Sequence, residues 1–172
     1  MGRVIAGQRR VSEFLLDTSF LITLVNPERD FHDTAKRYYR TALERGVPMY
    51  LSAIVASEFQ VRQPVASLPQ HNFIVLPFNI DHAVTAGRLF AELLQSVRDW
   101  QGQRSVVKDD VKLIAQADCG EIPYLLTADE QTLCRYARRL AEAGQVRTRP
   151  VVLSQGFDAA WFEGGQGTLL GG

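Results

Sequence analysis

Four acidic residues, Asp17, Glu58, Asp110 and Asp129, stand where an α/β protein can bring their side chains together. Carboxylates within a few ångströms of one another repel, and they hold protons unless a cation neutralises them. Oxygen ligands of this kind, with no His or Cys alongside, select Mg²⁺ or Mn²⁺ rather than zinc. Such ions activate water and stabilise charge on phosphate oxygens, so hydrolysis of a phosphodiester is the predicted chemistry.

Each of the four acids also has a purely structural interpretation. Asp17 and Asp129 each stand where a helix N-cap is wanted. Asp110 is a favourable charge near a helix N-terminus, and Glu58 could mark the solvent face of its helix. Only the combination of the four acids points to a metal site.

Asp109 and Asp110 compete for the third position. Neighbours on a helix point about 100° apart, so both cannot face the same way. Asp110 shares a helical stripe with Ile114 and Ala117, which must pack on the sheet. We therefore expect Asp110 to point inward, and we keep Asp109 as the weaker alternative.

The elements that must position these acids follow from the apolar pattern. Five short apolar runs have the length of buried strands, at residues 14–16, 49–51, 73–76, 124–126 and 151–153. Three stripes at helical spacing predict amphipathic helices: Phe31, Ala35, Tyr38, Tyr39 and Ala42; Ile80, Val84, Gly87, Ala91 and Leu94; and Leu133, Tyr136, Ala137 and Leu140. This alternation predicts an α/β fold with a mostly parallel central sheet of about five strands and helices on both faces, in three α/β/α layers.

Residues typical of helix ends and loops refine this layout. Asn79 and Asp129 are expected helix N-caps, and helices are expected to stop at Gly46, Gly120 and Gly144. Residues 63–70, with two prolines, predict a loop or broken helix, and residues 101–105 a polar break before a helix from about 108 to 119.

In an open parallel sheet, ligands bind outside the carboxyl ends of the strands. Asp17 ends the first run and Asp129 the fourth, while the second run leads through Ser52 into the helix that carries Glu58. Asp110 opens the helix before the fourth run. The sequence therefore predicts that the four acids meet on one rim of the sheet.

Length and charge bound the function. The 172 residues suffice for one domain, which is predicted at residues 13–157. An N-terminal extension at 1–12 and a glycine-rich tail at 158–172 flank this domain. The tail is expected to be ordered only if Trp161 and Phe162 pack against the domain. A formal net charge of zero argues against attraction of a polyanion by the whole surface, so any nucleic-acid contact must be local. The candidate basic patches are Arg37, Arg40 and Arg45, and Arg135, Arg138 and Arg139 with Arg147 and Arg149, although such runs are usually solvated helix faces.

The sequence also indicates a compartment. It has no apolar run long enough to span a membrane and no secretory signal at its N-terminus, so we expect a cytoplasmic protein without a membrane partner. Cys119 and Cys134 lack metal-ligand spacing and are expected to be ordinary buried or half-buried thiols.

At four segments the chain resembles the PIN domain, a family of metal-dependent nucleases that includes toxins of toxin-antitoxin pairs. The segments are FLLDTS at 14–19, SAIVASEF at 52–59, DVKLIAQA at 110–117 and YLLTAD at 124–129. The resemblance spans residues 14–157. It implies a ribonuclease whose Mg²⁺ or Mn²⁺ ions are held, directly or through water, by Asp17, Glu58, Asp110 and Asp129, with Thr18 and Thr127 as supporting hydroxyls. It further implies an RNA substrate, an antitoxin partner if the chain is a toxin, and a homodimer.

Three other readings compete. Haloacid-dehalogenase-like phosphatases also have an aspartate after the first strand, but they need a second acid two positions on, where this chain has Ser19. A dinucleotide-binding fold needs a Gly-rich turn after the first strand, which is missing here. A catalytically inactive PIN-like binding or scaffold module would keep the acids without assembling them around a metal.

Overall fold

The computed structural model describes residues 12–96 and 104–163. Five parallel strands form its sheet in the order β3-β2-β1-β4-β5. They are β1 (Phe14–Leu16), β2 (Met49–Ser52), β3 (Ile74–Leu76), β4 (Tyr124–Thr127) and β5 (Arg149–Val152). The predicted fold class is confirmed, and each predicted strand is present with its bounds shifted by at most two residues.

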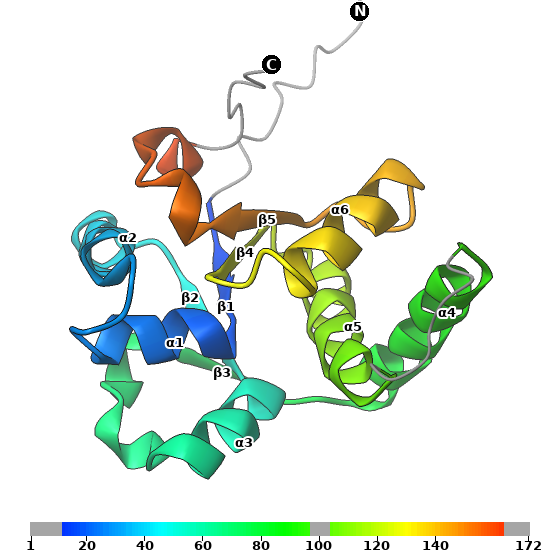
Figure 1. Ribbon diagram of the computed structural model, residues 1–172, viewed down its shortest axis with the longest axis horizontal. Helices are drawn as coiled ribbons and strands as arrows, with labels where there is room; N and C mark the ends of the chain where they lie inside the picture. Colours follow the sequence, from blue (N-terminus) through cyan, green and yellow to red (C-terminus); the bar gives the residue numbers. More distant parts are fainter. Residues whose placement is uncertain (1–11, 97–103, 164–172) are drawn as a thin grey trace, which may run out of the picture.

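Six helices of the described residues cover the sheet. They are α1 (Thr18–Val25), α2 (His32–Arg45), α3 (Ala53–Arg62), α4 (Ile80–Ser96), α5 (Arg104–Cys119) and α6 (Leu133–Glu142). Short 3₁₀ turns are η1 (Val65–Ser67), η2 (Gln70–Asn72), η3 (Leu153–Gln155) and η4 (Ala159–Phe162). In Figure 1, α1 and α2 lie on one side of the sheet and α4, α5 and α6 on the other. No helix among the described residues is long and apolar enough to cross a membrane.

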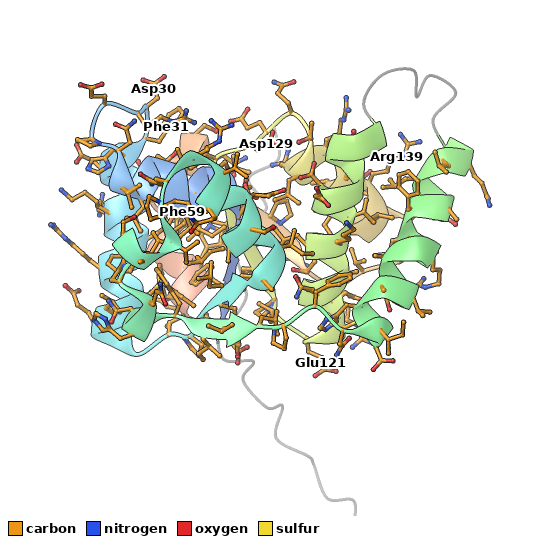
Figure 2. The ribbon with its side chains drawn as sticks, turned by 90° about the horizontal axis from the view of Figure 1, so that it is seen from below. Asp30, Phe31, Phe59, Glu121, Asp129 and Arg139 are labelled. Carbon is orange, nitrogen blue, oxygen red and sulfur yellow. The ribbon has the colours of Figure 1, made fainter. Side chains whose placement is uncertain are left out.

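The central strands β1 and β4 are buried on both faces. Phe14, Leu15 and Leu16 have no solvent exposure, and the same holds for Leu125 in β4. This double burial explains why these strands are continuous apolar runs instead of alternating ones. Figure 2 shows Phe59 of α3 in the same interior, with Asp30 and Glu121 at outer edges of the molecule.

The predicted apolar face of α6 is confirmed, but the prediction for α4 took the wrong face. The predicted face of α2 is correct except for Phe31, which precedes the helix and is 45% exposed. On α6, Leu133, Tyr136, Ala137 and Leu140 are all buried. On α4 the residues that pack inward are Ala86, Leu89 and Leu93. The predicted stripe lies on the opposite side of the helix, where Ile80 is 75% and Val84 is 68% exposed. The sequence carries two apolar stripes here, and periodicity alone does not say which one faces the core.

Several helix ends follow the predicted signals, but the N-cap of α6 is Thr132 and not the predicted Asp129. Asn79 caps α4 through its side chain, which accepts from the backbone N–H of His82 at 3.0 Å. Gly46 and Gly144 adopt left-handed conformations after α2 and α6. The helix α5 ends at Cys119, so it stops at the predicted Gly120, and the left-handed residue that follows is Glu121, with φ of 52°. The helix α5 itself begins at Arg104, earlier than predicted, while residues 101–103 of the predicted break lie outside the described residues.

The chain after β5 packs against the start of the sheet. Phe162 is 8% exposed, and its ring lies 5.2 Å from that of Phe14 and 6.0 Å from that of Tyr38. Trp161 makes an edge contact with Tyr124 at 5.0 Å. The condition set for order beyond residue 157 is therefore met through residue 163. The rest of the predicted tail and residues 1–11 of the predicted extension lie outside the described residues.

Neither cysteine is paired. Cys134 is buried, as predicted, but Cys119 at the end of α5 is exposed.

Candidate functional site

Asp17 lies where β1 meets α1, at the carboxyl edge of the sheet, and is 7% exposed. One of its oxygens, Oδ2, accepts hydrogen bonds from the Ser19 backbone N–H (3.2 Å), the Ser19 hydroxyl and the Thr127 hydroxyl (2.8 Å). The other oxygen, Oδ1, accepts none of these three bonds, and the backbone N–H of Thr18 lies near the carboxylate, where it also lowers the pKa of Asp17. Burial raises the pKa of Asp17, against the hydrogen bonds that lower it. Asp17 thus caps α1, as its structural interpretation requires, and keeps one oxygen available.

Two hydroxyls join the ends of β1 and β4 beneath Asp17. The Ser19 hydroxyl accepts from the Ala128 backbone N–H at 2.9 Å and lies 3.1 Å from the Thr127 hydroxyl. The Thr127 hydroxyl in turn accepts from the Asp129 backbone N–H at 2.9 Å. The positions of Asp17 and Asp129 are therefore linked by one hydrogen-bonded chain.

Glu58 faces the same rim from α3. Its Oε2 accepts a hydrogen bond from the Thr18 hydroxyl of α1, which orients the half-buried carboxylate. Burial raises the pKa of Glu58, and the charges of Asp17 and Asp109 raise it further, while the charge of Lys112 lowers it. The interpretation of Glu58 as a purely solvent-facing residue does not describe this environment.

Asp110 points inward from α5, on the stripe that Ile114 and Ala117 continue into the core at zero exposure. Its Oδ2 is buried and has no hydrogen-bond partner among the described residues. Burial, together with the charges of Asp17, Asp129 and Glu58, raises the pKa of Asp110 to about 7. Asp110 is therefore an electrostatically unsatisfied carboxylate in this cluster.

Asp129 is the best satisfied of the four acids. Its Oδ1 accepts from the backbone N–H groups of Gln131 (2.8 Å) and Thr132 (3.0 Å), and its Oδ2 accepts from the Thr132 hydroxyl. Burial acts to raise the pKa of Asp129, but these hydrogen bonds outweigh it and lower the pKa. The Thr132 hydroxyl also lowers the pKa of Asp110, so it lies between the two carboxylates.

The four acids thus influence one another at a single rim, formed by the ends of β1 and β4 and by α3 and α5. Within residues 12–96 and 104–163, however, no three acidic, His or Cys side chains are close enough to hold one ion as they stand. Three of the four carboxylates are turned toward hydroxyls, of Thr18, of Thr132, and of Ser19 and Thr127.

The donor set suits a hard divalent cation. Asp110 has a buried oxygen without a partner, Asp17 has a free oxygen, and burial raises the pKa of Asp17, Glu58 and Asp110. Each of these features disfavours the cluster when no positive charge is bound, and a divalent cation would relieve them together. With oxygen as the available donor, the preferred ions are Mg²⁺ and Mn²⁺.

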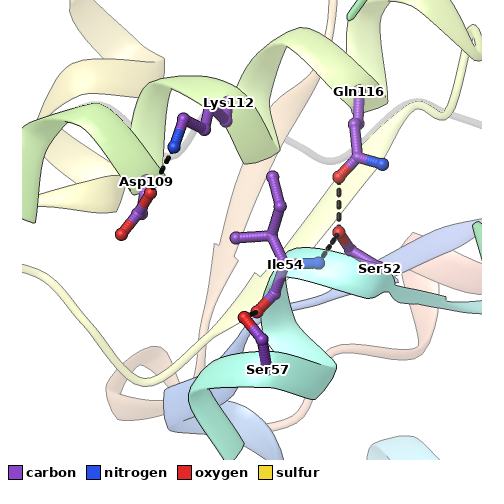
Figure 3. A network of polar contacts seen from close by, with 6 residues as sticks. All are labelled: Ser52, Ile54, Ser57, Asp109, Lys112 and Gln116. Carbon is purple, nitrogen blue, oxygen red and sulfur yellow. Dashed lines mark hydrogen bonds and ion pairs between the residues drawn. The ribbon is translucent and has the colours of Figure 1, made fainter. Parts of the chain in front are cut away.

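Sequence reasoning named Thr18 and Thr127 as supporting hydroxyls but missed two more, Ser19 and Thr132. A local signal existed for both, because an aspartate that begins a turn or helix accepts from the backbone N–H two or three residues on, which places that residue beside the carboxylate. Sequence reasoning also missed Gln116, a buried side chain that ties α5 to the start of α3. The Ser52 hydroxyl donates to Gln116 Oε1 at 2.5 Å (Figure 3).

Asp109 does not share the position of Asp110. Its Oδ1 pairs with Lys112 Nζ at 2.8 Å, and both side chains are about two-fifths exposed, at 42% and 40%. An aspartate already paired with an ammonium group is a poorer cation ligand than one with an unpartnered oxygen. The geometry therefore favours Asp110 over Asp109 as a ligand, and this choice stays a prediction.

No protein-family model matches the sequence, and no curated protein matches it. Several solved structures do. A chain of the VapBC2 complex of Rickettsia felis bound to a DNA fragment from its promoter superimposes with a TM-score of 0.54 at 14% identity, covering 81% of this chain and 97% of that one. The VapC20 toxin of Mycobacterium tuberculosis, which cleaves the sarcin-ricin loop, gives 0.54 at 19%, covering 80% and 100%. A VapBC-1 chain of nontypeable Haemophilus influenzae gives 0.54 at 15%, covering 82% and 98%.

These identities are too low to carry a substrate or a partner from those proteins to this chain. The match covers nearly the whole of each solved chain, so the fold is shared. Residues outside the shared part make up about a fifth of this chain. The chain has the PIN-domain fold.

Proposed function

We propose that this chain is a divalent-metal-dependent endoribonuclease that hydrolyses RNA phosphodiester bonds, as the toxin of a toxin-antitoxin pair. The observation that carries the proposal is the cluster of four mutually repelling carboxylates at the carboxyl edge of the sheet, with the buried Oδ2 of Asp110 left without a partner. The PIN-domain fold and its likeness to RNA-cleaving VapC toxins support it.

The residues of the chain prepare the site. Asp17 is fixed by three hydrogen bonds on one oxygen, so its other oxygen is held toward the rim. Thr18 orients Glu58, and Asp110 supplies the unpartnered oxygen. Mg²⁺ or Mn²⁺ held by Asp17, Glu58 and Asp110, with Asp129 directly or through water, would supply positive charge for the phosphate oxygens and acidify water for in-line attack.

The test is cleavage of RNA by the purified chain. An oligonucleotide with the sarcin-ricin loop sequence is the first substrate to try, beside an unstructured single strand, because a structurally similar toxin cuts that loop. We expect cleavage with Mn²⁺ or Mg²⁺ and none with EDTA. Cleavage that continues in EDTA would show a different activity or a contaminating nuclease.

A catalytically inactive binding module is the alternative, and two observations favour it. No three of the described acidic, His or Cys side chains stand ready to hold an ion, and Asp129 is fully occupied by its own turn. Thermal denaturation with increasing Mn²⁺ separates the two proposals. A nuclease site gains stability with Mn²⁺, by about 2.7 kcal/mol at a hundredfold excess over its Kd, whereas an inactive module gives a flat response.

The antitoxin is part of the proposed toxin function. The genomic prediction is a small open reading frame directly beside this one. Co-expression of its product is expected to give a complex that co-purifies with the chain and suppresses RNA cleavage. A chain without such a neighbour would remain a nuclease candidate but would lose the toxin role.

We further propose that the chain forms a homodimer through the exposed stripe of α4. Ile80, Val84, Gly87, Ala91 and Leu94 repeat at spacings of four and three residues, and all five are exposed. This spacing is typical of the contact face of two paired helices, and the small residues at its centre permit the two helix backbones to approach closely. The flanking residues Asp81 and Arg88 carry opposite charges seven positions apart, so an antiparallel second copy sets unlike charges against each other.

Val84→Glu is expected to weaken this dimer by roughly tenfold or more, because it places two carboxylates near the twofold axis of an apolar seam. Sedimentation velocity over a range of protein concentrations measures the effect. Val61→Glu is the matched control, since Val61 of α3 is 87% exposed and lies away from α4. A wild type that stays monomeric at every concentration rules out this interface.

A further inference from the structure

A single basic side chain stands out among the charges that act on the acid cluster. In the leading influences on the pKa values of Asp17, Glu58, Asp110 and Asp129, Lys112 is the one described cation, and it acts on Glu58. Its Nζ lies 2.8 Å from Asp109 Oδ1, and Asp109 acts on Glu58 with the opposite sign. The Asp109–Lys112 pair therefore lies at the edge of the cluster, on the side of Glu58.

The placement of Lys112 is built into the packing of α5. Figure 3 shows Lys112 and Gln116, one helical turn apart, extending from α5 on the side of α3. Gln116 is fully buried, accepts from the Ser52 hydroxyl at 2.5 Å and donates to the carbonyl oxygen of Pro77 at 3.2 Å. These bonds fix this turn of α5 against α3 and β3, and with it the root of the Lys112 side chain.

The pair itself is easily opened. Ion pairs between side chains that are about 40% exposed contribute little to stability, because water solvates both groups nearly as well when they separate. A lysine ammonium on its flexible stem has three donors and can turn to a new anion at low cost. Lys112 can therefore exchange Asp109 for another negatively charged group without disturbing the fold.

An anionic substrate needs such a cation here. The cluster is acidic and the chain has no net charge, so the surface offers no general attraction to RNA. Several other described cations are engaged elsewhere: Arg37 stacks on Phe157, Arg45 on Phe162 and Arg135 on Tyr136, and Arg88 donates to Gln145. Lys112 lies close enough to Glu58 to lower its pKa, so it is a cation placed to meet a phosphate that approaches the acids along the α3–α5 side.

We propose that Lys112 is a positioning residue that binds a backbone phosphate of the RNA next to the one being cut. Before RNA arrives, Asp109 holds the ammonium group away from Glu58 and so keeps Glu58 free for the cation. In this proposal Asp109 positions the Lys112 ammonium group and does not bind the metal ion. This inference rests on the proposed ribonuclease function.

The experiment measures steady-state cleavage and the binding of a short fluorescein-labelled single-stranded RNA for four variants. Lys112→Gln is expected to raise KM and the RNA Kd about fivefold with little change in kcat. The slope of log Kd against log salt should fall by the amount that corresponds to about one phosphate contact. Lys112→Arg should restore affinity. Asp109→Asn should leave RNA affinity near the wild-type value but raise the Mn²⁺ concentration needed for half-maximal thermal stabilisation, because the freed ammonium group then competes at Glu58.

The matched control is Lys36→Gln, which removes the same charge from α2. An equal loss of affinity in Lys36→Gln would show a general charge effect and overturn the proposal. RNA that the wild type binds and cuts, with KM unchanged in Lys112→Gln, would overturn it while leaving the ribonuclease function intact. RNA that the wild type neither binds nor cuts would overturn both. A loss confined to kcat would place Lys112 in the chemistry and would also contradict a positioning role.

Discussion

Replacing Asp17 by asparagine is expected to abolish both RNA cleavage and the stabilisation by Mn²⁺. The amide oxygen of asparagine can take over the three hydrogen bonds that Asp17 Oδ2 accepts from Ser19 and Thr127. The amide NH₂ group then occupies the position of the free Oδ1 and presents two hydrogens toward the cation. The fold should persist while the affinity for the ion is lost.

We expect kcat/KM to fall by roughly 100-fold or more, since even outer contacts of a metal site contribute tenfold to a hundredfold. The wild type should gain roughly 5 to 10 °C in Tm at a hundredfold excess of Mn²⁺ over its Kd, and Asp17→Asn should gain none. Asp33→Asn removes an exposed carboxylate from the first turn of α2 and serves as the control. Undiminished cleavage by Asp17→Asn would contradict the assignment of the site.

Replacing Asp110 by asparagine is expected to have two opposite effects. It should remove the response to Mn²⁺ and, at the same time, stabilise the protein when no metal is present. The pKa of Asp110 is about 7 in the folded chain and 3.8 when unperturbed. Between these values the folded protein holds a proton that the unfolded chain has released, so stability falls as pH rises from about 4 to 7 and levels off above pH 7.

Asp110→Asn removes this loss. In EDTA at pH 8, we expect the variant to be more stable than the wild type by about 2 kcal/mol, allowing for solvent screening at the rim. At pH 4 the difference should nearly vanish, because Asp110 is then protonated in the folded state. Urea denaturation at both pH values measures the effect. Equal stabilities at pH 8 would show that Asp110 carries no uncompensated charge.

The sequence was sufficient for the fold because its signals agree at several levels. The strand β1 is fully apolar and β4 is apolar up to its last residue, Thr127, which marks both strands as central, and the polar residues at their ends mark the carboxyl edge. The inward direction of Asp110 follows from the helical stripe it shares with Ile114 and Ala117. Placing acids at strand ends therefore needed no structural information beyond the periods of strands and helices.

Other features depended on information that a one-dimensional pattern does not contain. The sequence of α4 has two apolar stripes on opposite sides, and only the position of α5 decides that Leu89 is inside and Val84 outside. The direction of each carboxylate depends on nearby hydroxyls, so the saturation of Asp129 by Thr132 and the orphaned oxygen of Asp110 emerge only from three-dimensional contacts.

The contact between Phe14 and Phe162 joins the first strand to the last described turn. Both segments lie at the amino ends of the strands, on the far side of the sheet from Asp17. A short peptide linking these two segments, with the chain reopened at an exposed loop such as that around Gly46, should give a circularly permuted protein that still folds. Such a permutant would move the ends of the chain to the loop around Gly46 and leave the acidic rim unchanged.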